Sequence, residues 1–472
     1  MTWDDTRSDD TSAVELVRRM AARQTTATET VRECLSRIAL RDPALNAFSM
    51  VLADQATKDA AGLDAAMAAG DPPGPLHGVP IAVKDGLDVA GCVTTHGGRG
   101  NSTPASADCM VVHRLRQAGA IVIGKTRMPE LGLWPHTESS HGGITRNPWD
   151  PTRTAGGSSG GSAVAVASGM VPVALASDGG GSIRIPAACC GVYGLKPSRG
   201  RVTASPRPAM WSGLVTIGPM GRTVLDTALV GDLIRGNTAG DRYTHPEPPM
   251  SFVAAAESEP GRLRVGWSTR VRRMWPRVAR EHVRAVEGTA RLLADLGHDV
   301  FEVDPRLPDS AAVFVPELLA GIREVADGVE HFELLEQRTQ RMYRMGSWVS
   351  PEVLAKSLQK REQIAAQANR VFDRIDVLLT PTVPHRPCRV GVLDARGPLR
   401  QMFQSRPMAA FTSLWNVAGN PAAAVPAGLA DDNLPVSVQL VGRLGDETTL
   451  LSLSAQLERV QPWPVSGRWP RR

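Results

Sequence analysis

Two glycine-rich turns enclose an apolar stretch between residues 155 and 186, and no other feature of the chain constrains its fold as strongly. The first turn reads AGGSSGGSA and the second reads SDGGGSIRIP. The run of residues 164–176 between them has no charged side chain, but glycine and proline interrupt it. It therefore predicts a helix over residues 164–169 and a strand over residues 171–176. An apolar helix and an apolar strand joined so closely are typical of a sheet with helices packed against it.

The same alternation of short apolar runs and helical patterns continues along most of the chain. Strands that alternate with helices predict an α/β fold, with a single large domain in which helices cover both faces of a central mixed β-sheet. The further strands are expected at residues 78–83, 120–123, 263–267, 299–303, 376–381 and 435–441, and helices at 110–118, 281–296 and 447–457.

The patterning divides the 472 residues into two parts. A capping box at residues 12–15 and apolar positions at helical spacing predict that residues 1–70 are a helical segment packing on the core. A turn rich in proline and glycine follows, and residues 71–472 form the α/β domain. Within that domain, residues 311–372 are expected to be a mostly helical insertion.

Composition argues against several classes of partner. The net charge is +5, but only six of the 53 cationic residues are lysines and the arginines are scattered, so we expect no nucleic-acid partner. No stretch approaches the ~18 apolar residues of a membrane span, and the acidic start MTWDD predicts no signal peptide. The six cysteines form no C-x-x-C pair, which indicates free thiols in a cytoplasmic protein and no metal site.

A serine and a lysine in these segments can carry nucleophilic chemistry. Ser182 follows Gly179, Gly180 and Gly181, whose N–H groups can approach a developing oxyanion with no side chain in the way. Lys84 ends an apolar strand, and burial lowers the pKa of a lysine enough to make it a base. Taken singly, a glycine-rich serine turn is usually only a loop, and a lysine at a strand end is usually a solvated charge.

The joint pattern resembles the amidase signature family. The family's GGSSGGSA motif stands at residues 156–163, its D-x-G-G-S-I-R motif at residues 178–184, and its G-x-P-x-x-x-K-D motif at residues 78–85. The resemblance covers most of the chain, from about residue 12 to about residue 458, and these motifs are highly specific.

This resemblance implies a Ser–cis-Ser–Lys triad. Ser182 would be the nucleophile and would carry the acyl group. Ser158, 24 residues earlier, would follow a cis peptide bond after Gly157 and relay a proton. Lys84 would be the base, and the backbone amides of residues 179–182 would form the oxyanion hole.

The implied activity is hydrolysis of a carboxylic amide to a carboxylate and ammonia or an amine. We expect a small-molecule amide as the partner, no cofactor, no metal and no membrane, and we leave a homodimer open. The variable segments, the insertion at 311–372 among them, should build the acyl pocket. The residues expected to bind the substrate are apolar or aromatic: Trp211, Phe314, Tyr343, Phe411 and Trp415.

One branch of the family is an alternative, namely the A subunit of the amidotransferase that makes amidated tRNA. That branch usually carries SDTGGSIRQP and, downstream, SLDQIGP. Here residues 177–186 read SDGGGSIRIP, and residues 213–219 read GLVTIGP. Apolar residues thus replace the polar ones expected near a glutamine substrate. This favours a stand-alone bacterial-type amidase for small apolar or aryl amides.

A motif of a different class occurs at residues 119–126. Their sequence GAIVIGKT matches the P-loop pattern G-x-x-x-x-G-K-T of nucleotide-binding proteins. A phosphate-binding loop needs a strand before the first glycine and a loop between the two glycines. Here Ala-Ile-Val-Ile fills that interval and is itself a strand pattern, so we expect no nucleotide site.

Overall fold

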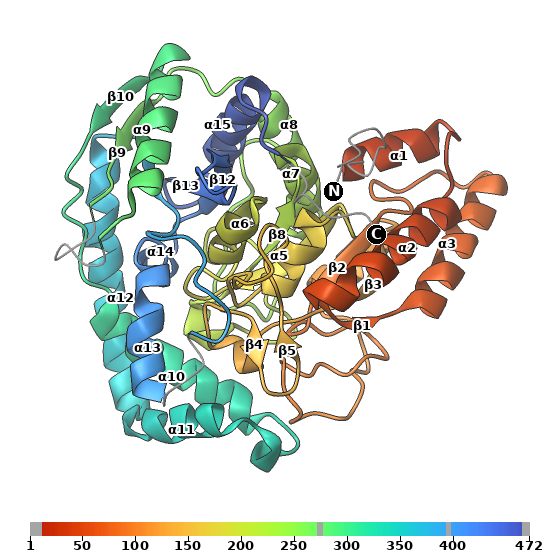
Figure 1. Ribbon diagram of the computed structural model, residues 1–472, viewed down its shortest axis with the longest axis horizontal. Coiled ribbons are helices and arrows are strands. Elements are labelled where there is room, and N and C mark those ends of the chain that lie inside the picture. Colours follow the sequence, from red (N-terminus) through yellow and green to blue (C-terminus); the bar gives the residue numbers. More distant parts are fainter. Residues whose placement is uncertain (1–11, 271–276, 393–397, 465–472) are drawn as a thin grey trace.

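The computed structural model describes residues 12–270, 277–392 and 398–464. Within these ranges the centre is one sheet of eleven strands, in the order β1-β3-β2-β6-β8-β7-β12-β13-β11-β9-β10, with helices on both sides (Figure 1). The strands are β1 Phe48–Val51, β2 Pro80–Lys84, β3 Ile121–Thr126, β6 Val173–Asp178, β7 Tyr193–Lys196, β8 Thr216–Gly221, β9 Arg264–Trp267, β10 Asp299–Glu302, β11 Val377–Pro381, β12 Ala422–Leu429 and β13 Pro435–Val441. A separate hairpin pairs β4 Glu138–Ser139 with β5 Gly143–Ile144.

The sheet is mixed, as the sequence predicted. Strand β2 runs parallel to β3 and β6, and β9 runs parallel to β10 and β11. The other neighbouring pairs are antiparallel. Parallel strands need covering helices on both faces, which explains why every residue of β2 and β6 is buried.

Helices cover both faces of the sheet. On one face α7, α8, α9 and α15 pack against side chains such as Leu195 and Leu440. On the other, α10, α12 and α14 pack against Leu378 and Val441. The helices are α1 Ala13–Ala21, α2 Ala27–Leu45, α3 Ala53–Ala68, α4 Met110–Gln117, α5 Gly160–Ala167, α6 Arg184–Cys190, α7 Val224–Ile234, α8 Phe252–Glu257, α9 Arg280–Asp295, α10 Ala311–Asp327, α11 Gln337–Met345, α12 Pro351–Asn369, α13 Pro398–Ser405, α14 Ser413–Ala418 and α15 Glu447–Val460. None of the helices in the described ranges is long and apolar enough to cross a bilayer.

The N-terminal part differs from its prediction in one respect. Helices α1, α2 and α3 form as expected, but between α2 and α3 the strand β1 joins the edge of the sheet, antiparallel to β3. A four-residue strand is too short to show a clear alternating pattern, and its partner strand β3 supplies the backbone hydrogen bonds that define it. Residues 1–11 of the predicted segment lie outside the described residues.

Residues 311–372 are mostly helical, as predicted, and contain α10, α11 and α12. Three strands, β7, β8 and β12, were not predicted. Glycine and proline lie inside them, as in the TIGPMG sequence of β8, and these residue types usually indicate turns rather than strands.

The P-loop pattern at residues 119–126 is not a loop. Strand β3 continues through Gly124, Lys125 and Thr126, so no phosphate cradle exists there. The Lys125 ammonium is buried and lies 2.9 Å from the Asp85 carboxylate. This lysine therefore has a structural partner, and the nucleotide-binding alternative is rejected.

Candidate active site

Ser182 lies in the loop that joins β6 to α6. Strand β6 ends at Asp178 and helix α6 begins at Arg184. Between them Gly181 has φ +129°, a conformation that only glycine adopts readily. The loop leaves Ser182 partly exposed, whereas Asp178 and Arg184 are completely buried.

Lys84 reaches the same place from the neighbouring strand. Because β2 and β6 are parallel, with Val83 opposite Leu175, their carboxyl ends meet at one edge of the sheet. The Lys84 side chain is buried, and its Nζ lies 2.8 Å from Ser158 Oγ and 3.0 Å from Ser177 Oγ. Within the described chain no carboxylate is hydrogen-bonded to this amine.

Burial without a carboxylate partner changes the protonation of Lys84. Desolvation lowers the pKa of its amine to about 7, and the negative charge of Asp178 opposes that shift only in part. Near neutral pH a large fraction of the amine is therefore uncharged. An uncharged amine has a lone pair that can accept the proton of the Ser158 hydroxyl.

Ser158 lies two residues before α5, which begins at Gly160. The peptide bond between Gly157 and Ser158 is cis. A Cβ on Gly157 would lie 2.6 Å from the backbone nitrogen of His136, so only glycine fits at this close approach of the two backbones. Lys84, Ser158 and Ser182 all line one small cavity. The structure thus brings the three residues of the expected triad together.

The serines beside Ser158 hold the surrounding backbone. Ser159 Oγ donates to the Ser177 carbonyl oxygen at 3.2 Å. Ser162 Oγ donates to the Leu175 carbonyl oxygen at 3.1 Å and contacts Thr126 Oγ1 at 2.7 Å. These contacts tie the first glycine-rich turn to strands β6 and β3.

The Asp178 carboxylate organises the loop that carries Ser182. It accepts hydrogen bonds from the Gly181 amide at 2.6 Å and the Ile183 amide at 3.1 Å, and it pairs with Arg184 Nε at 2.9 Å. Burial alone would raise the pKa of this carboxyl. The charge and hydrogen bonds of Arg184 outweigh burial and hold the pKa well below its usual range.

Arg184 connects the loop to the C-terminal part of the chain. Its guanidinium donates to the Thr412 carbonyl oxygen at 3.0 Å, to Gln439 Oε1 at 2.8 Å and to Asn416 Oδ1 at 2.6 Å. The Asn416 amide in turn donates to Asp178 Oδ1 at 2.9 Å. This buried arginine is therefore surrounded by acceptors, which is the condition for burying a charge without a large loss of stability.

The four amides expected to form an oxyanion hole differ in their partners. The Gly181 amide is already bonded to Asp178. No acceptor in the described part of the chain binds the amides of Gly179, Gly180 or Ser182. Three of the four amides are therefore free to bind an oxyanion, and Gly181 instead anchors the loop.

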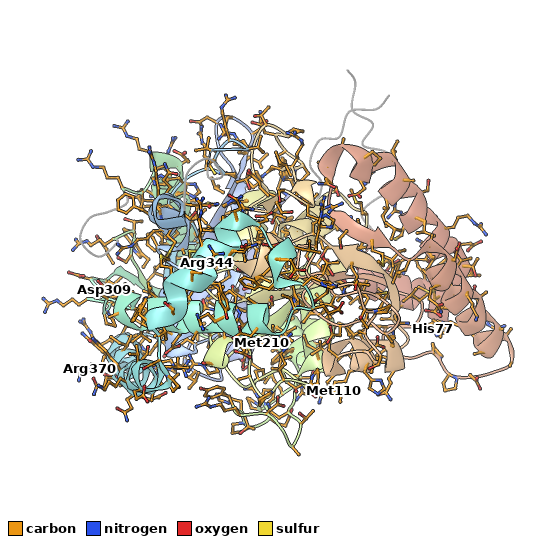
Figure 2. All side chains as sticks on the ribbon, turned by 90° about the horizontal axis from the view of Figure 1, so that it is seen from below. His77, Met110, Met210, Asp309, Arg344 and Arg370 are labelled. Carbon is orange, nitrogen blue, oxygen red and sulfur yellow. The ribbon has the colours of Figure 1, made fainter. Side chains whose placement is uncertain are left out.

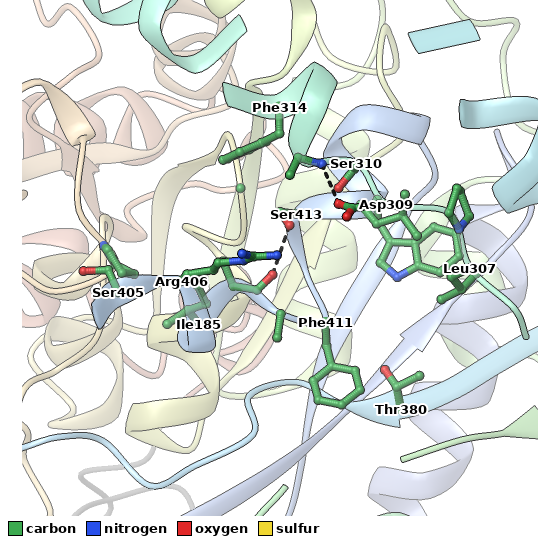
Figure 3. Close-up of a pocket in the computed structure, with 18 of the residues that line it drawn as sticks. Ile185, Leu307, Asp309, Ser310, Phe314, Thr380, Ser405, Arg406, Phe411 and Ser413 are labelled. Atoms are coloured by element: carbon green, nitrogen blue, oxygen red, sulfur yellow. Dashed lines mark hydrogen bonds between the residues drawn. The ribbon is translucent and has the colours of Figure 1, made fainter. Parts of the chain in front are cut away.

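A cleft of about 1430 Å³ opens beside Ser182. Gly180 and Ser182 lie in its wall, and Phe314 from α10 faces the same space as Ile185 and Phe411 (Figure 3). The predicted substrate-binding residues Trp211, Phe314, Phe411 and Trp415 all line this cleft.

Tyr343 is the exception among the predicted pocket residues, because it is not part of the cleft wall. Its ring packs edge-on against Phe332 with centroids 4.8 Å apart, and its hydroxyl donates to Asp327 at 2.5 Å. The Arg323 guanidinium lies over the Tyr343 ring, 4.5 Å from its centroid. Helix α11 therefore directs this side chain towards α10 and away from the cleft.

Sequence reasoning missed two residues of the site. Ser177 stands one position before the recognised motif, and its hydroxyl is a second partner of Lys84. The only available signal was its place at the end of a buried strand. Asn416 binds Asp178 from 238 residues away, and nothing local in the sequence indicates that contact.

The sequence also matches a known family model, Amidase, over residues 29–451. The chain belongs to the amidase signature family. AmiB2 of Mycobacterium tuberculosis, an amidase by name, is 45% identical over 431 residues, which is 91% of each protein. The structure of 6-aminohexanoate cyclic dimer hydrolase matches with a TM-score of 0.90 at 30% identity, covering 97% of this chain and 98% of that one. A bacterial aryl acylamidase of the amidase signature family matches with a TM-score of 0.86 at 29% identity, over 96% and 97% of the two chains.

Membership of the amidase signature family makes this protein a hydrolase of amide C–N bonds. Family enzymes act on small-molecule amides. The A subunit of the glutamyl-tRNA(Gln) amidotransferase of Nitratidesulfovibrio vulgaris is a more distant relative than AmiB2, at 37% identity over 480 residues.

Proposed function

We propose that the protein hydrolyses a carboxylic amide through an acyl-Ser182 intermediate. The observation that carries this proposal is the buried hydrogen bond of 2.8 Å between Lys84 Nζ and Ser158 Oγ, beside the glycine-rich loop of Ser182. In water a serine hydroxyl is a weak nucleophile, and it needs a base that takes its proton as it attacks.

The proton path follows from the order of these groups. Ser182 Oγ attacks the carbonyl carbon and passes its proton to Ser158 Oγ, while the Ser158 proton moves to Lys84 Nζ. When the C–N bond breaks, the leaving nitrogen takes a proton back from Ser158, and Lys84 returns one to Ser158. A water molecule then cleaves the acyl ester by the same route, which releases the carboxylate and restores Ser182.

The developing oxyanion would be bound by the amides of Gly179, Gly180 and Ser182. These donors are fixed by the loop and need no reorganisation during the reaction, which is the condition under which such donors are most effective. Gly181 supports them indirectly, since its amide holds the loop on Asp178.

The cleft supports a substrate with an apolar or aromatic acyl group. Trp211, Phe314, Phe411 and Trp415 line it, and burial of apolar area favours binding by about 25 cal/mol per Å². Helices α10 and α12 of the insertion at 311–372 contribute Phe314, Leu318 and Gln367. We infer a stand-alone enzyme for small apolar or aryl amides rather than an amidotransferase subunit, because the residues beside Ser182 are apolar where that branch is polar.

The free cysteines support a cytoplasmic location. All six cysteines are unpaired and five of them are buried. Reduced thiols persist in the cytosol, whereas oxidising compartments favour disulfides.

A fluorophosphonate probe tests the nucleophile directly, because an activated serine attacks phosphorus as it attacks a carbonyl. We expect one covalent adduct, mapped by peptide mass spectrometry to Ser182, and loss of the adduct in Ser182→Ala. The same substitution should reduce amide hydrolysis by at least ~10⁴-fold while the melting temperature stays close to that of the wild type. An adduct at another serine would contradict the assignment.

A further inference from the structure

Two cavities of very different size meet at Ser182. One is the cleft of about 1430 Å³, and the other has a volume of only about 40 Å³. Ser182, Gly132 and Trp211 line both. Both cavities are therefore within reach of the groups on either side of a carbonyl carbon placed at Ser182 Oγ.

The triad decides which part enters which cavity. Lys84 and Ser158 line the small cavity and do not line the large cleft. As the C–N bond breaks, the leaving nitrogen must receive a proton from a donor within about 2.6–3.2 Å. Since Ser158 is that donor in the proposed mechanism, the leaving nitrogen lies in the small cavity, and the acyl group lies in the cleft.

The small cavity has little room. One water molecule needs about 10–15 Å³ by this measure, so 40 Å³ accommodates about three atoms of that size. Its walls are tight: a Cβ on Gly132 would already lie 3.4 Å from Ser158 Oγ and 3.2 Å from the Met128 methyl group. Leu131 and Val325 complete the apolar wall and are themselves buried.

We propose that this cavity restricts the leaving group to ammonia or an amine of up to about three non-hydrogen atoms. The substrates are then primary carboxamides, or amides of very small amines, with a bulky apolar acyl group. This inference rests on the proposed function and narrows it, because it separates carboxamides from anilides and peptides.

The first experiment compares leaving groups on one acyl group. The purified enzyme is given 4-phenylbutanamide and its N-phenyl anilide, and kcat/KM is measured for each. We expect the primary amide to be preferred by at least ~100-fold, although aniline is the better leaving group in solution. Equal rates, or a preference for the anilide, would overturn the proposal while the amidase function stands. If the enzyme hydrolysed neither compound and no other amide in a panel, both this proposal and the proposed amidase function would be contradicted.

The second experiment enlarges the cavity. Met210 lines only the small cavity, and Met402 lines only the cleft; Figure 2 labels Met210 near the middle of the molecule. We expect Met210→Ala to raise the ratio of anilide to carboxamide kcat/KM by at least ~10-fold. The matched variant Met402→Ala should leave that ratio unchanged even if both rates fall. Val325→Ala replaces Met210→Ala if the latter does not fold. An unchanged ratio in a folded variant of the small cavity contradicts the size limit.

Discussion

The loop of Ser182 and the wall of the cleft are built in opposite ways. In the loop, Asp178 and Arg184 are fully buried, and each has several hydrogen-bond partners. In the cleft wall, Phe314 and Met402 are only partly buried and contribute apolar surface without specific polar partners. The loop of Ser182 is fixed by a buried network in which every member depends on the others, whereas Phe314 and Met402 in the proposed acyl pocket can be exchanged without leaving a buried polar group unpaired.

This difference has consequences for mutation. A change in the loop network should alter both stability and turnover, because it leaves a buried charge or amide without a partner. A change in the cleft should alter which substrates react and leave the reaction itself intact. Lys84 is a third case, since its burial costs stability while its proposed role as the base supports turnover.

The largest effect in this comparison is expected from Lys84→Met. It removes the proposed base, so kcat should fall by about 10²–10⁴-fold. The wild-type kcat/KM should rise with pH through about 7, because only the uncharged amine accepts a proton and the pKa of Lys84 is about 7. Stopped assays of ammonia release across pH 5–9 measure both effects.

The stability of Lys84→Met should not fall, and this separates a base from a structural lysine. The folded pKa lies below the usual value of 10.5, so between about pH 7 and 10.5 the unfolded chain binds more protons. The free energy of unfolding of the wild type therefore rises with pH in that window, and near pH 7 the methionine variant should melt at a higher temperature. A strongly destabilised variant with ordinary residual activity would return Lys84 to a structural role.

The next largest effect is expected from Asp178→Asn. Removing one member of a buried ion pair leaves Arg184 without its counter-charge, which costs about 3–5 kcal/mol of unfolding free energy. Because the Gly181 and Ile183 amides lose the same carboxylate, kcat should fall together with stability. Urea unfolding and kinetics on one preparation test this. A variant with normal stability and normal kcat would show that the network does not hold the loop.

The smallest effect is expected in the cleft. Phe314→Ala should lower kcat/KM for a bulky aromatic acyl amide by about 10–200-fold, the usual range for removing apolar contacts from a pocket. Acetamide, whose acyl group offers only a methyl group to the apolar wall, should be affected much less. The matched aromatic control is Tyr343→Ala, since Tyr343 lies outside the cleft wall, and it should not change the ratio of the two substrates. Equal losses for both substrates in Phe314→Ala would mean that Phe314 supports the fold rather than the acyl group.

Local pattern was sufficient for much of the fold and not for all of it. The runs that became β2, β6 and β13 are apolar and bounded by turn residues, so they were predicted within a few residues of their ends. β8 was missed because its Gly218 and Pro219 indicate a turn, and only pairing with β6 and β7 makes it a strand.

The aromatic residues of the pocket show the same limit. Phe314 and Tyr343 looked equivalent in the sequence, but the packing of α10 and α11 turns one into the cleft and the other out of it.

The sequence by itself determined the motifs, the family and the residues able to do the chemistry, because spacing along the chain preserves such information. Only the tertiary structure decided how those groups act. The pKa of Lys84 is lowered by burial under segments distant in the sequence, and Arg184 is held by Asn416 and Gln439, more than 200 residues away. The difference in size between the two cavities at Ser182 likewise depends on side chains from several elements. Burial, long-range hydrogen bonds and cavity volume are properties of packing, and no local pattern encodes them.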